Sequence, residues 1–231
     1  MPSDYVRELE RESMRFVGAL EEDRLLGRII GGQATHAEYA HFLSATYHYV
    51  RWSGFLLAKT AEGLRESERC PLLVALADSK SEEESPHDAW ALRDLERLGV
   101  NAELVKGAPP PRAVQAYLHF SLTLAEEGSP AFLGAAYTLE FISMHRAKRA
   151  AENLRARGKI PNIEAALSFL EGHGDADLEH VARLADLLRQ VKDPRDQSAI
   201  TFSATVLRAL YPRFFHAASS PASSRSCLHF A

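Results

Sequence analysis

The amino-acid sequence predicts an all-α protein, and three observations support this prediction. Apolar residues recur every three or four positions through almost every long segment, which is the period of a helix with one buried face. No segment shows the sustained alternation and β-branched content that are typical of a strand. Residues that start and stop helices separate the periodic segments. With 231 residues, the chain is long enough to bury a sizeable core in one helical bundle.

The first half of the chain contains four predicted helices. Their approximate bounds are 3–20, 23–30, 35–66 and 71–98. The pair Gly31-Gly32 ends the second helix, and Thr35 with Glu38 forms a capping box that begins the third. We expect an interruption of the fourth helix near Pro86, because proline removes a backbone hydrogen bond. Gly99 ends this helix at the position after the C-cap, where glycine is favoured.

The second half of the chain contains four more predicted helices. Their approximate bounds are 112–127, 131–157, 163–191 and 193–217. The stretch 106–111 is rich in proline, but it is too short to separate two domains. Ser129-Pro130 provides the N-cap and first-turn residues of the next helix. We therefore expect one helical domain over residues 1–218, followed by a Ser-rich disordered tail over 219–231.

Composition excludes several classes of protein. A net charge of −4, with basic and acidic residues intermixed, gives no reason to expect nucleic acid or a membrane surface as a partner. Two cysteines, Cys70 and Cys227, are too few for a disulfide framework. The start of the chain lacks the apolar region of a signal peptide, and no apolar run reaches the ~18 residues of a membrane span. We expect a cytoplasmic protein.

The most informative motif lies in the predicted helix 163–191. His173, Asp177 and His180 stand at positions i, i+4 and i+7, which share one face of a helix over two turns. Two imidazoles and a carboxylate on one face are half of a metal site, and iron, zinc and manganese all accept such ligands. Taken alone, the triplet could equally be a charged surface cluster beside Asp175 and Glu179.

Two other helices could provide the remaining ligands. Glu84 and His87 form a carboxylate-x-x-His pair of the same form as Asp177 and His180. Glu140 lies among apolar residues, where a carboxylate needs a proton, a cation or a metal. Taken singly, Glu84 could belong to a solvated charge run, His87 to an exposed helix start, and Glu140 to an ion pair with an arginine or a lysine. Together they match the way in which helical bundles hold two metal ions, and they favour iron or manganese over structural zinc.

Three motifs resemble those of the haem-oxygenase-like diiron oxidases and oxygenases. The family's His-x3-Asp-x2-His motif is similar to the segment FLEGHGDADLEHV, its central glutamate motif to YTLEFIS, and its third core helix to EEESPHDAWALRDLERLG. The motifs occur in the family's order, and the resemblance spans roughly residues 39–188. It implies a seven- to eight-helix haem-oxygenase-like up-down bundle, the fold of haem oxygenase, the TenA thiaminases and the PQQ-synthesis oxidase. It also implies six metal ligands: Glu84, His87, Glu140, His173, Asp177 and His180.

The sequence departs from this family at two positions. Pro86 occupies the place of a small flexible residue before the motif histidine, so we expect the segment to be mobile or partly unwound without metal. Because of this proline, Glu83 is an alternative to Glu84 as the ligand. Some members carry a glutamate seven residues before the histidine, where this chain has Lys80, which cannot serve as a ligand.

The resemblance also implies a chemistry. Two Fe(II) ions, or manganese in their place, would activate dioxygen as co-substrate for N-oxygenation, desaturation or oxidative carbon–carbon cleavage of an amino acid, an amine or a fatty-acid-like molecule. The expected partners are this small-molecule substrate, an electron donor and a second copy of the chain in a homodimer. No catalytic residue beyond the metal ligands is predicted.

We also expect a set of aromatic and basic residues to contact the substrate, although ordinary core packing is an alternative for each aromatic residue. The aromatic candidates would line a cavity, and the basic ones would bind a substrate carboxylate. The set consists of Tyr47, Arg51, Trp52, Phe55, Tyr137, Phe141 and Arg146, with Lys59 as a further basic candidate.

Three rival functions remain open from the sequence. A haem-degrading enzyme would need a proximal histidine near the first helix, but the first histidine is His36. A TenA-type hydrolase would need a cysteine nucleophile in the core, and neither Cys70, just before a proline, nor Cys227, in the tail, fits that role well. A helical bundle that binds metal or a partner without turnover, as an accessory or effector protein, is the non-catalytic alternative.

Overall fold

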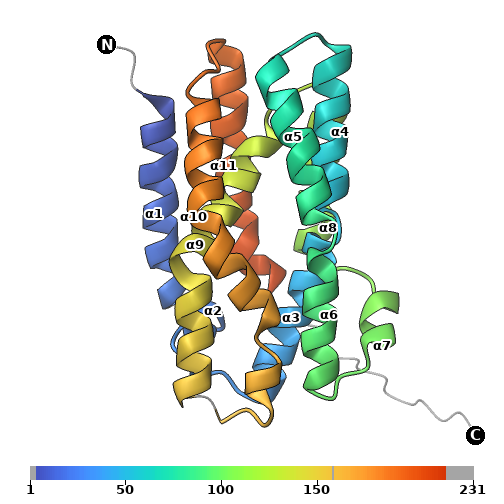
Figure 1. Cartoon of the computed structure of the whole chain (residues 1–231), viewed down its shortest axis with the longest axis vertical. Helices are drawn as coiled ribbons and strands as arrows, with labels where there is room; N and C mark the ends of the chain where they lie inside the picture. Colours follow the sequence, from blue (N-terminus) through green and yellow to red (C-terminus); the bar gives the residue numbers. More distant parts are fainter. Residues whose placement is uncertain (1–3, 158, 217–231) are drawn as a thin grey trace, which may run out of the picture.

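The computed structural model describes residues 4–157 and 159–216, and the side chains of all of these except 174–179. The described chain is helical and contains no strand (Figure 1). Its helices are α1 (Tyr5–Glu22), α2 (Leu26–Ile30), α3 (His36–Val50), α4 (Ser53–Glu66), α5 (Pro71–Glu84), α6 (His87–Arg97), α7 (Ala102–Gly107), α8 (Arg112–Glu126), α9 (Phe132–Arg157), α10 (Ser168–Leu188) and α11 (Pro194–Phe214). The all-α prediction is therefore confirmed. The predicted tail lies outside the described residues.

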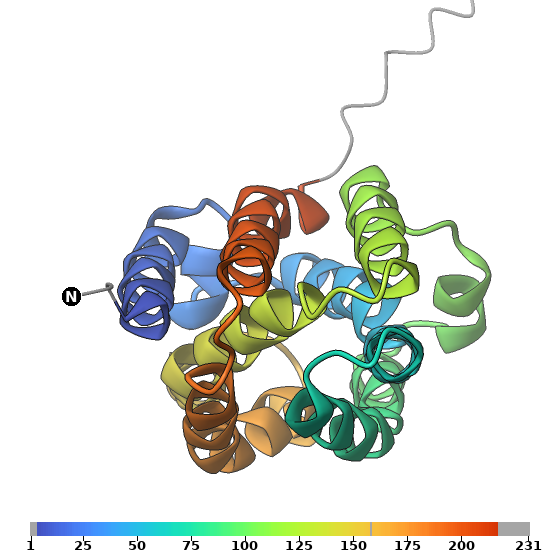
Figure 2. The same cartoon turned by 90° about the horizontal axis from the view of Figure 1, so that it is seen from above.

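Helix α9 runs through the middle of the bundle, and most of the other helices surround it (Figures 1 and 2). Its main neighbours are α10 and α11. The approach to α11 is very close, since a Cβ atom on Gly134 would lie 1.9 Å from the backbone oxygen of Ile200. Glu140 lies six residues further along α9 and is 9% exposed, so it is held in the interior of the bundle.

Two helix pairs bend at the same level of the bundle. Helix α3 packs against α6, and α4 packs against α5. The chain breaks between α5 and α6 at Ser85-Pro86, as the proline predicts. It also breaks between α3 and α4 at Arg51-Trp52. The two breaks adjoin, because the hydroxyl of Ser81 in α5 donates a hydrogen bond to the backbone oxygen of Gly54 at 2.9 Å.

The structure corrects the predicted helices at three places. The expected single helix 35–66 is two helices, α3 and α4. Its two halves pack against different helices, because their partners α6 and α5 are separated by the break at Pro86. The expected helix 163–191 begins later, at Ser168, after a 3-10 turn at Ile163–Ala165. Helix α7 was not predicted at all, although Asn101 caps it by accepting from the backbone N–H of Glu103.

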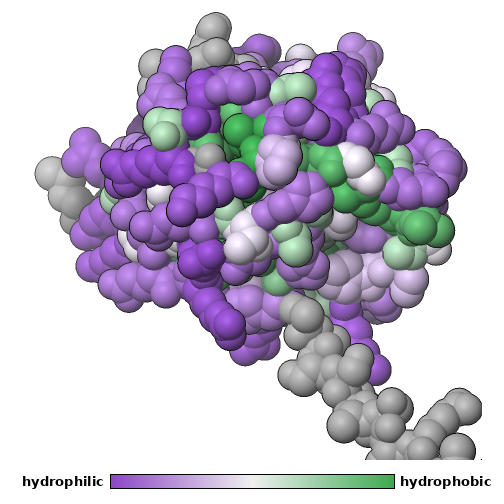
Figure 3. Space-filling view, turned by 90° about the horizontal axis from the view of Figure 1, so that it is seen from below, coloured by the Kyte–Doolittle hydropathy of each residue, from purple (hydrophilic) through white to green (hydrophobic). Residues whose placement is uncertain are grey.

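The end of the bundle drawn in Figure 3 is mainly hydrophilic. Figure 3 shows one end, where apolar side chains are visible in the recesses between hydrophilic ones. Among the described residues, no helix is both long and apolar enough to cross a membrane.

Candidate metal centre

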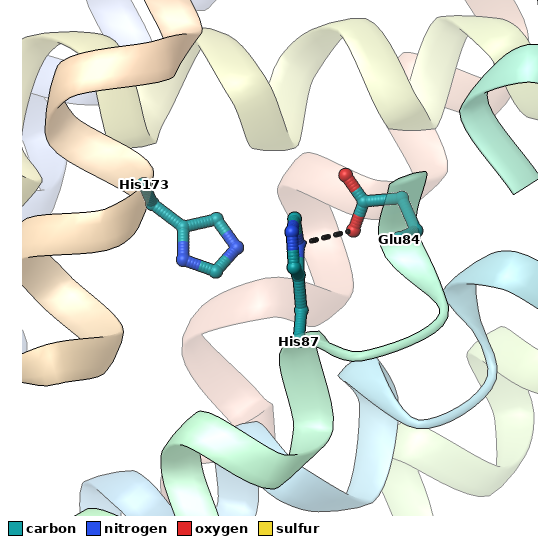
Figure 4. A group of neighbouring side chains, drawn as sticks. All are labelled: Glu84, His87 and His173. Atoms are coloured by element: carbon teal, nitrogen blue, oxygen red, sulfur yellow. Dashed lines mark hydrogen bonds and ion pairs between the residues drawn. The ribbon is translucent and has the colours of Figure 1, made fainter. Parts of the chain in front are cut away.

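Three side chains from three helices meet beside α9. Glu84 lies at the end of α5, His87 at the start of α6, and His173 in the second turn of α10 (Figure 4). One ligand atom from each lies within 4.8 Å of the others. The two imidazole rings meet edge to face, with centroids 4.7 Å apart. A carboxylate and two imidazoles at this separation form a donor set that iron, manganese or zinc can accept.

The hydrogen bonds of the two histidines leave one nitrogen of each ring free for a metal. His173 Nδ1–H donates to the backbone oxygen of Phe169 at 2.8 Å, which leaves Nε2 with its lone pair. His87 Nδ1–H donates to Glu84 Oε2 at 3.1 Å, with the same consequence. Burial, and then the neighbouring His87, lower the pKa of His173, so this ring is held in the neutral form that binds metals.

Asp94 holds the helix that carries His173 in place. Its carboxylate, in α6, is fully buried and accepts from the hydroxyl of Ser168 at 2.5 Å and from the backbone N–H of Phe169 at 2.8 Å. These are groups of the first turn of α10, so Asp94 caps the helix from a neighbouring element. Burial raises the pKa of Asp94, and the hydrogen bonds from Phe169 and Ser168 oppose that rise. Asp94 thereby fixes the position of α6 relative to α10.

Aromatic rings enclose the two histidines. Trp90 stacks on His87 with centroids 4.3 Å apart, and Phe169 lies 4.3 Å from His173. Helix α10 can approach Trp90 only because residue 172 is glycine, since a Cβ atom there would lie 2.5 Å from the indole ring. This packing fixes the ring orientations and excludes water from one side of the cluster.

A second group of predicted ligands lies next to the first. Glu140 Oε1 accepts from the ammonium of Lys80 at 2.8 Å, and Lys80 also lies 3.5 Å from Glu83 Oε1. Glu83 in turn contacts His180 Nδ1 at 3.0 Å. Of the two glutamates that the sequence left as alternatives, Glu84 belongs to the three-residue cluster and Glu83 lies beside His180.

The charges of this second group are only partly balanced. Burial raises the pKa of Glu140 to about 7, while the Lys80 ammonium opposes that rise. For Lys80, burial acts to lower the pKa, but the carboxylates of Glu140, Glu83 and Glu84 outweigh it and leave the pKa above its usual value. Among the described groups, Glu140 Oε2 has no hydrogen-bond partner although it is buried. A buried carboxylate oxygen without a partner is a suitable ligand for a metal cation.

Comparison with known families identifies the chain at the level of its family. The sequence profile of the iron-containing redox enzymes matches residues 40–211, which is most of the chain and includes every predicted ligand. The chain belongs to this family. Membership implies that the chain binds iron, and the Glu84–His87–His173 cluster is a site that could hold it. A search of curated proteins gave no match.

Solved structures show the haem-oxygenase-like fold. One is a domain of unknown function with a heme oxygenase-like fold from Shewanella denitrificans, 19% identical, with a TM-score of 0.78 over 90% of this chain and 89% of that one. Another is a TenA homologue from P. horikoshii, 16% identical, with a TM-score of 0.71 over 91% of this chain and 98% of that one. At these identities the likeness shows the fold alone, and it confirms the predicted fold class.

The six predicted ligands of this chain fall into three groups in the structure. Glu84, His87 and His173 come together directly, while Glu140 and His180 border them through Lys80 and Glu83. The side chain of Asp177 lies outside the described ones.

Four of the residues predicted to contact the substrate lie at or near the surface of the bundle. Trp52 and Phe55 are 37% and 44% exposed, so neither lines an interior cavity, contrary to expectation. Arg51 is also exposed and lies over the Tyr47 ring. The cause is the break between α3 and α4, which turns this stretch towards the surface. Lys59 pairs with Glu62 at the surface, 2.5 Å away.

The remaining candidates are in the core. Tyr47, Tyr137 and Phe141 are buried and pack against their neighbours, as the core-packing alternative describes. Arg146 borders an apolar pocket, but its guanidinium is paired with Glu21 at 2.6 Å.

That apolar pocket lies against the metal cluster. Its cavity volume is about 50 Å³, and its wall includes Phe169, whose ring contacts His173. Most of the wall is apolar, with aromatic contributions from Phe42, Tyr49, Phe169 and Tyr211. Sequence periodicity indicated only that these rings face the core. That they share one cavity depends on the packing of α3, α10 and α11.

Cys70 lacks the character of a nucleophile. Burial, and then a hydrogen bond from its Sγ to Asp196 Oδ2 at 3.4 Å, raise its pKa to about 11. We expect iodoacetamide at pH 8 to alkylate Cys70 at least about tenfold more slowly than a free cysteine, because the thiolate is the reactive form. Mass spectrometry of a Cys227→Ser variant would measure the rate, with glutathione as the control. Alkylation as fast as that of glutathione would contradict the raised pKa of Cys70 and would favour the alternative of a TenA-type hydrolase.

Proposed function

We propose that this member of the iron-containing redox enzymes is a non-haem diiron oxidase or oxygenase that activates dioxygen to oxidise a small molecule. The observation that carries the proposal is the Glu84–His87–His173 cluster, in which one ligand atom of each side chain lies within 4.8 Å of the others. The second group, Glu140 with His180 and Glu83, supplies donors for a second ion. Manganese is an alternative metal for the same oxygen and nitrogen donors.

The protein's own side chains would hold the metal and shape its surroundings. Glu84, His87 and His173 would bind the first ion, and bound ferrous iron would supply electrons for the reduction of dioxygen. Trp90 and Phe169 would keep water from the histidine rings, since both lie against them. Asp94 would maintain the distance between α6 and α10, and with it the separation of the two imidazoles.

The apolar pocket, with a cavity volume of about 50 Å³, has room for a small apolar group of a substrate. Because its wall includes Phe169, a molecule bound there would approach the metal cluster from the α10 side. An amine, an amino acid with an apolar side chain, or a fatty-acid-like molecule fits this description. N-oxygenation, desaturation and oxidative carbon–carbon cleavage are the candidate reactions. Where one oxygen atom enters the product and the other leaves as water, the substrate supplies one pair of electrons, and an external electron donor must supply the other.

The proposal is tested by oxygen consumption. The purified chain is loaded with ferrous iron under nitrogen, mixed with air-saturated buffer, and followed with an oxygen electrode against a panel of amines, amino acids and fatty acids. We expect consumption that depends on both iron and one class of substrate. Iron bound without any substrate-dependent consumption would instead favour the non-catalytic, metal-binding alternative.

A further inference from the structure

Lys80 occupies an unusual position between the two groups of predicted ligands. It is buried, with 6% of its side chain exposed, and no other lysine is buried in the part of the chain that the structure describes. Its ammonium lies 2.8 Å from Glu140 Oε1 and 3.5 Å from Glu83 Oε1. Lysine is almost never fully buried unless it is paired. Here both of its partners are carboxylates of the candidate metal centre.

The surroundings of this ammonium are those of a bound cation. Glu140 and Glu83 approach it from two helices, and His180 follows from a third through its contact with Glu83. Lys80 stands one turn before Glu83 and Glu84 on α5, so the helix directs all three toward the centre. By contrast, the ion pairs of Lys80 among the described residues do not include Glu84, whose carboxylate accepts from His87 instead. The ammonium of Lys80 is therefore paired with the carboxylates of the second group, Glu140 and Glu83, and not with the carboxylate of the first.

We propose that the Lys80 ammonium occupies the second cation position of this centre, so that a second metal ion binds only by displacing it and the two positions fill in order. The first ion binds to Glu84, His87 and His173. The second binds to the side bordered by Glu140, Glu83 and His180 once the ammonium has moved away. This inference rests on the metal-binding part of the proposed function.

The physical reason is competition between two cations for the same carboxylates. A metal ion at Glu140 must break the ion pair with Lys80, and it is repelled by the ammonium until that group has moved. No such competitor stands at the first position. We therefore expect unequal affinities, with the second ion bound at least about 100-fold more weakly than the first.

The experiment is an anaerobic calorimetric titration with ferrous iron alone, so that no turnover occurs. In the wild-type protein we expect one tight and one weak binding event. In Lys80→Gln, which keeps a hydrogen-bond donor beside Glu140 but removes the charge, we expect the second event to tighten at least about tenfold while the first changes little. Lys80→Arg keeps the charge and should keep the second event weak. Lys59→Gln is the matched control, since this lysine pairs with Glu62 at the surface.

The outcomes separate this inference from the proposed function. Unchanged second-site affinity in Lys80→Gln, with normal first-site binding, would overturn the role of Lys80 and leave the iron site standing. Absence of any iron binding would overturn both. Circular dichroism would show whether each variant is folded. A wild-type titration in which two ions bind with equal affinity would overturn the inference without any variant.

Discussion

His173→Ala is expected to lower the affinity of the first site for ferrous iron by at least about 100-fold, because loss of even an outer partner of a metal ligand costs 10–100-fold. The substitution removes one of the two imidazoles in the Glu84–His87–His173 cluster. It leaves behind a small space between Phe169 and Trp90 that alanine cannot fill. Anaerobic titration with ferrous iron would measure the change directly.

The matched control for this substitution is His119→Ala. His119 is exposed on α8, away from the cluster, so its removal should leave iron binding unchanged. If His173→Ala bound iron as tightly as the wild type, the three-residue cluster would not be the iron site, and the second group around Glu140 would have to bind the first ion.

Asp94→Ala is expected to lower the free energy of unfolding by about 3 kcal/mol, because it removes a helix cap and leaves buried donors without partners. Asp94 accepts from the hydroxyl of Ser168 and the backbone N–H of Phe169, and no other described group replaces it there. Since these contacts hold α10 against α6, the loss should also weaken iron binding by the protein that remains folded. Urea unfolding followed by circular dichroism would measure the first effect.

Two further variants make this prediction specific. Asp94→Asn keeps an oxygen acceptor and should lose less stability than Asp94→Ala. Asp186→Ala removes a carboxylate from an exposed pair with Arg189 on the same helix α10, and should change stability by less than about 1 kcal/mol. If Asp94→Ala were as stable as Asp186→Ala, the structural role assigned to Asp94 would be wrong.

Helix ends marked by local chemistry could be predicted from the sequence. The capping box of Thr35 and Glu38 is formed as expected, Gly99 adopts a positive φ of 81° after α6, and the chain breaks at Pro86. The break at Arg51-Trp52 could not be predicted in the same way. Helical periodicity continues across it, and its cause is the bend of neighbouring helices, which is a property of the tertiary structure.

For the candidate metal centre, the sequence predicted the residues within each motif but not the contacts between helices. Spacing identified Glu84, His87 and His173, because each stands in a motif whose period matches one face of a helix. Spacing could not show that Glu140 would pair with Lys80, or that Glu83 would reach His180, since these contacts join different helices. In the same way, the position of a ring on a helix does not tell whether that stretch faces the core, as at Tyr47, or the surface, as at Phe55.

The location of bound iron is the most direct test of the central claim. Crystals grown with ferrous iron under nitrogen would be measured at the iron absorption edge, and an anomalous difference map would be calculated. We predict a strong peak between Glu84, His87 and His173, with a weaker one beside Glu140 that grows as the iron concentration rises. Iron bound elsewhere, with no peak among these three side chains, would contradict the account.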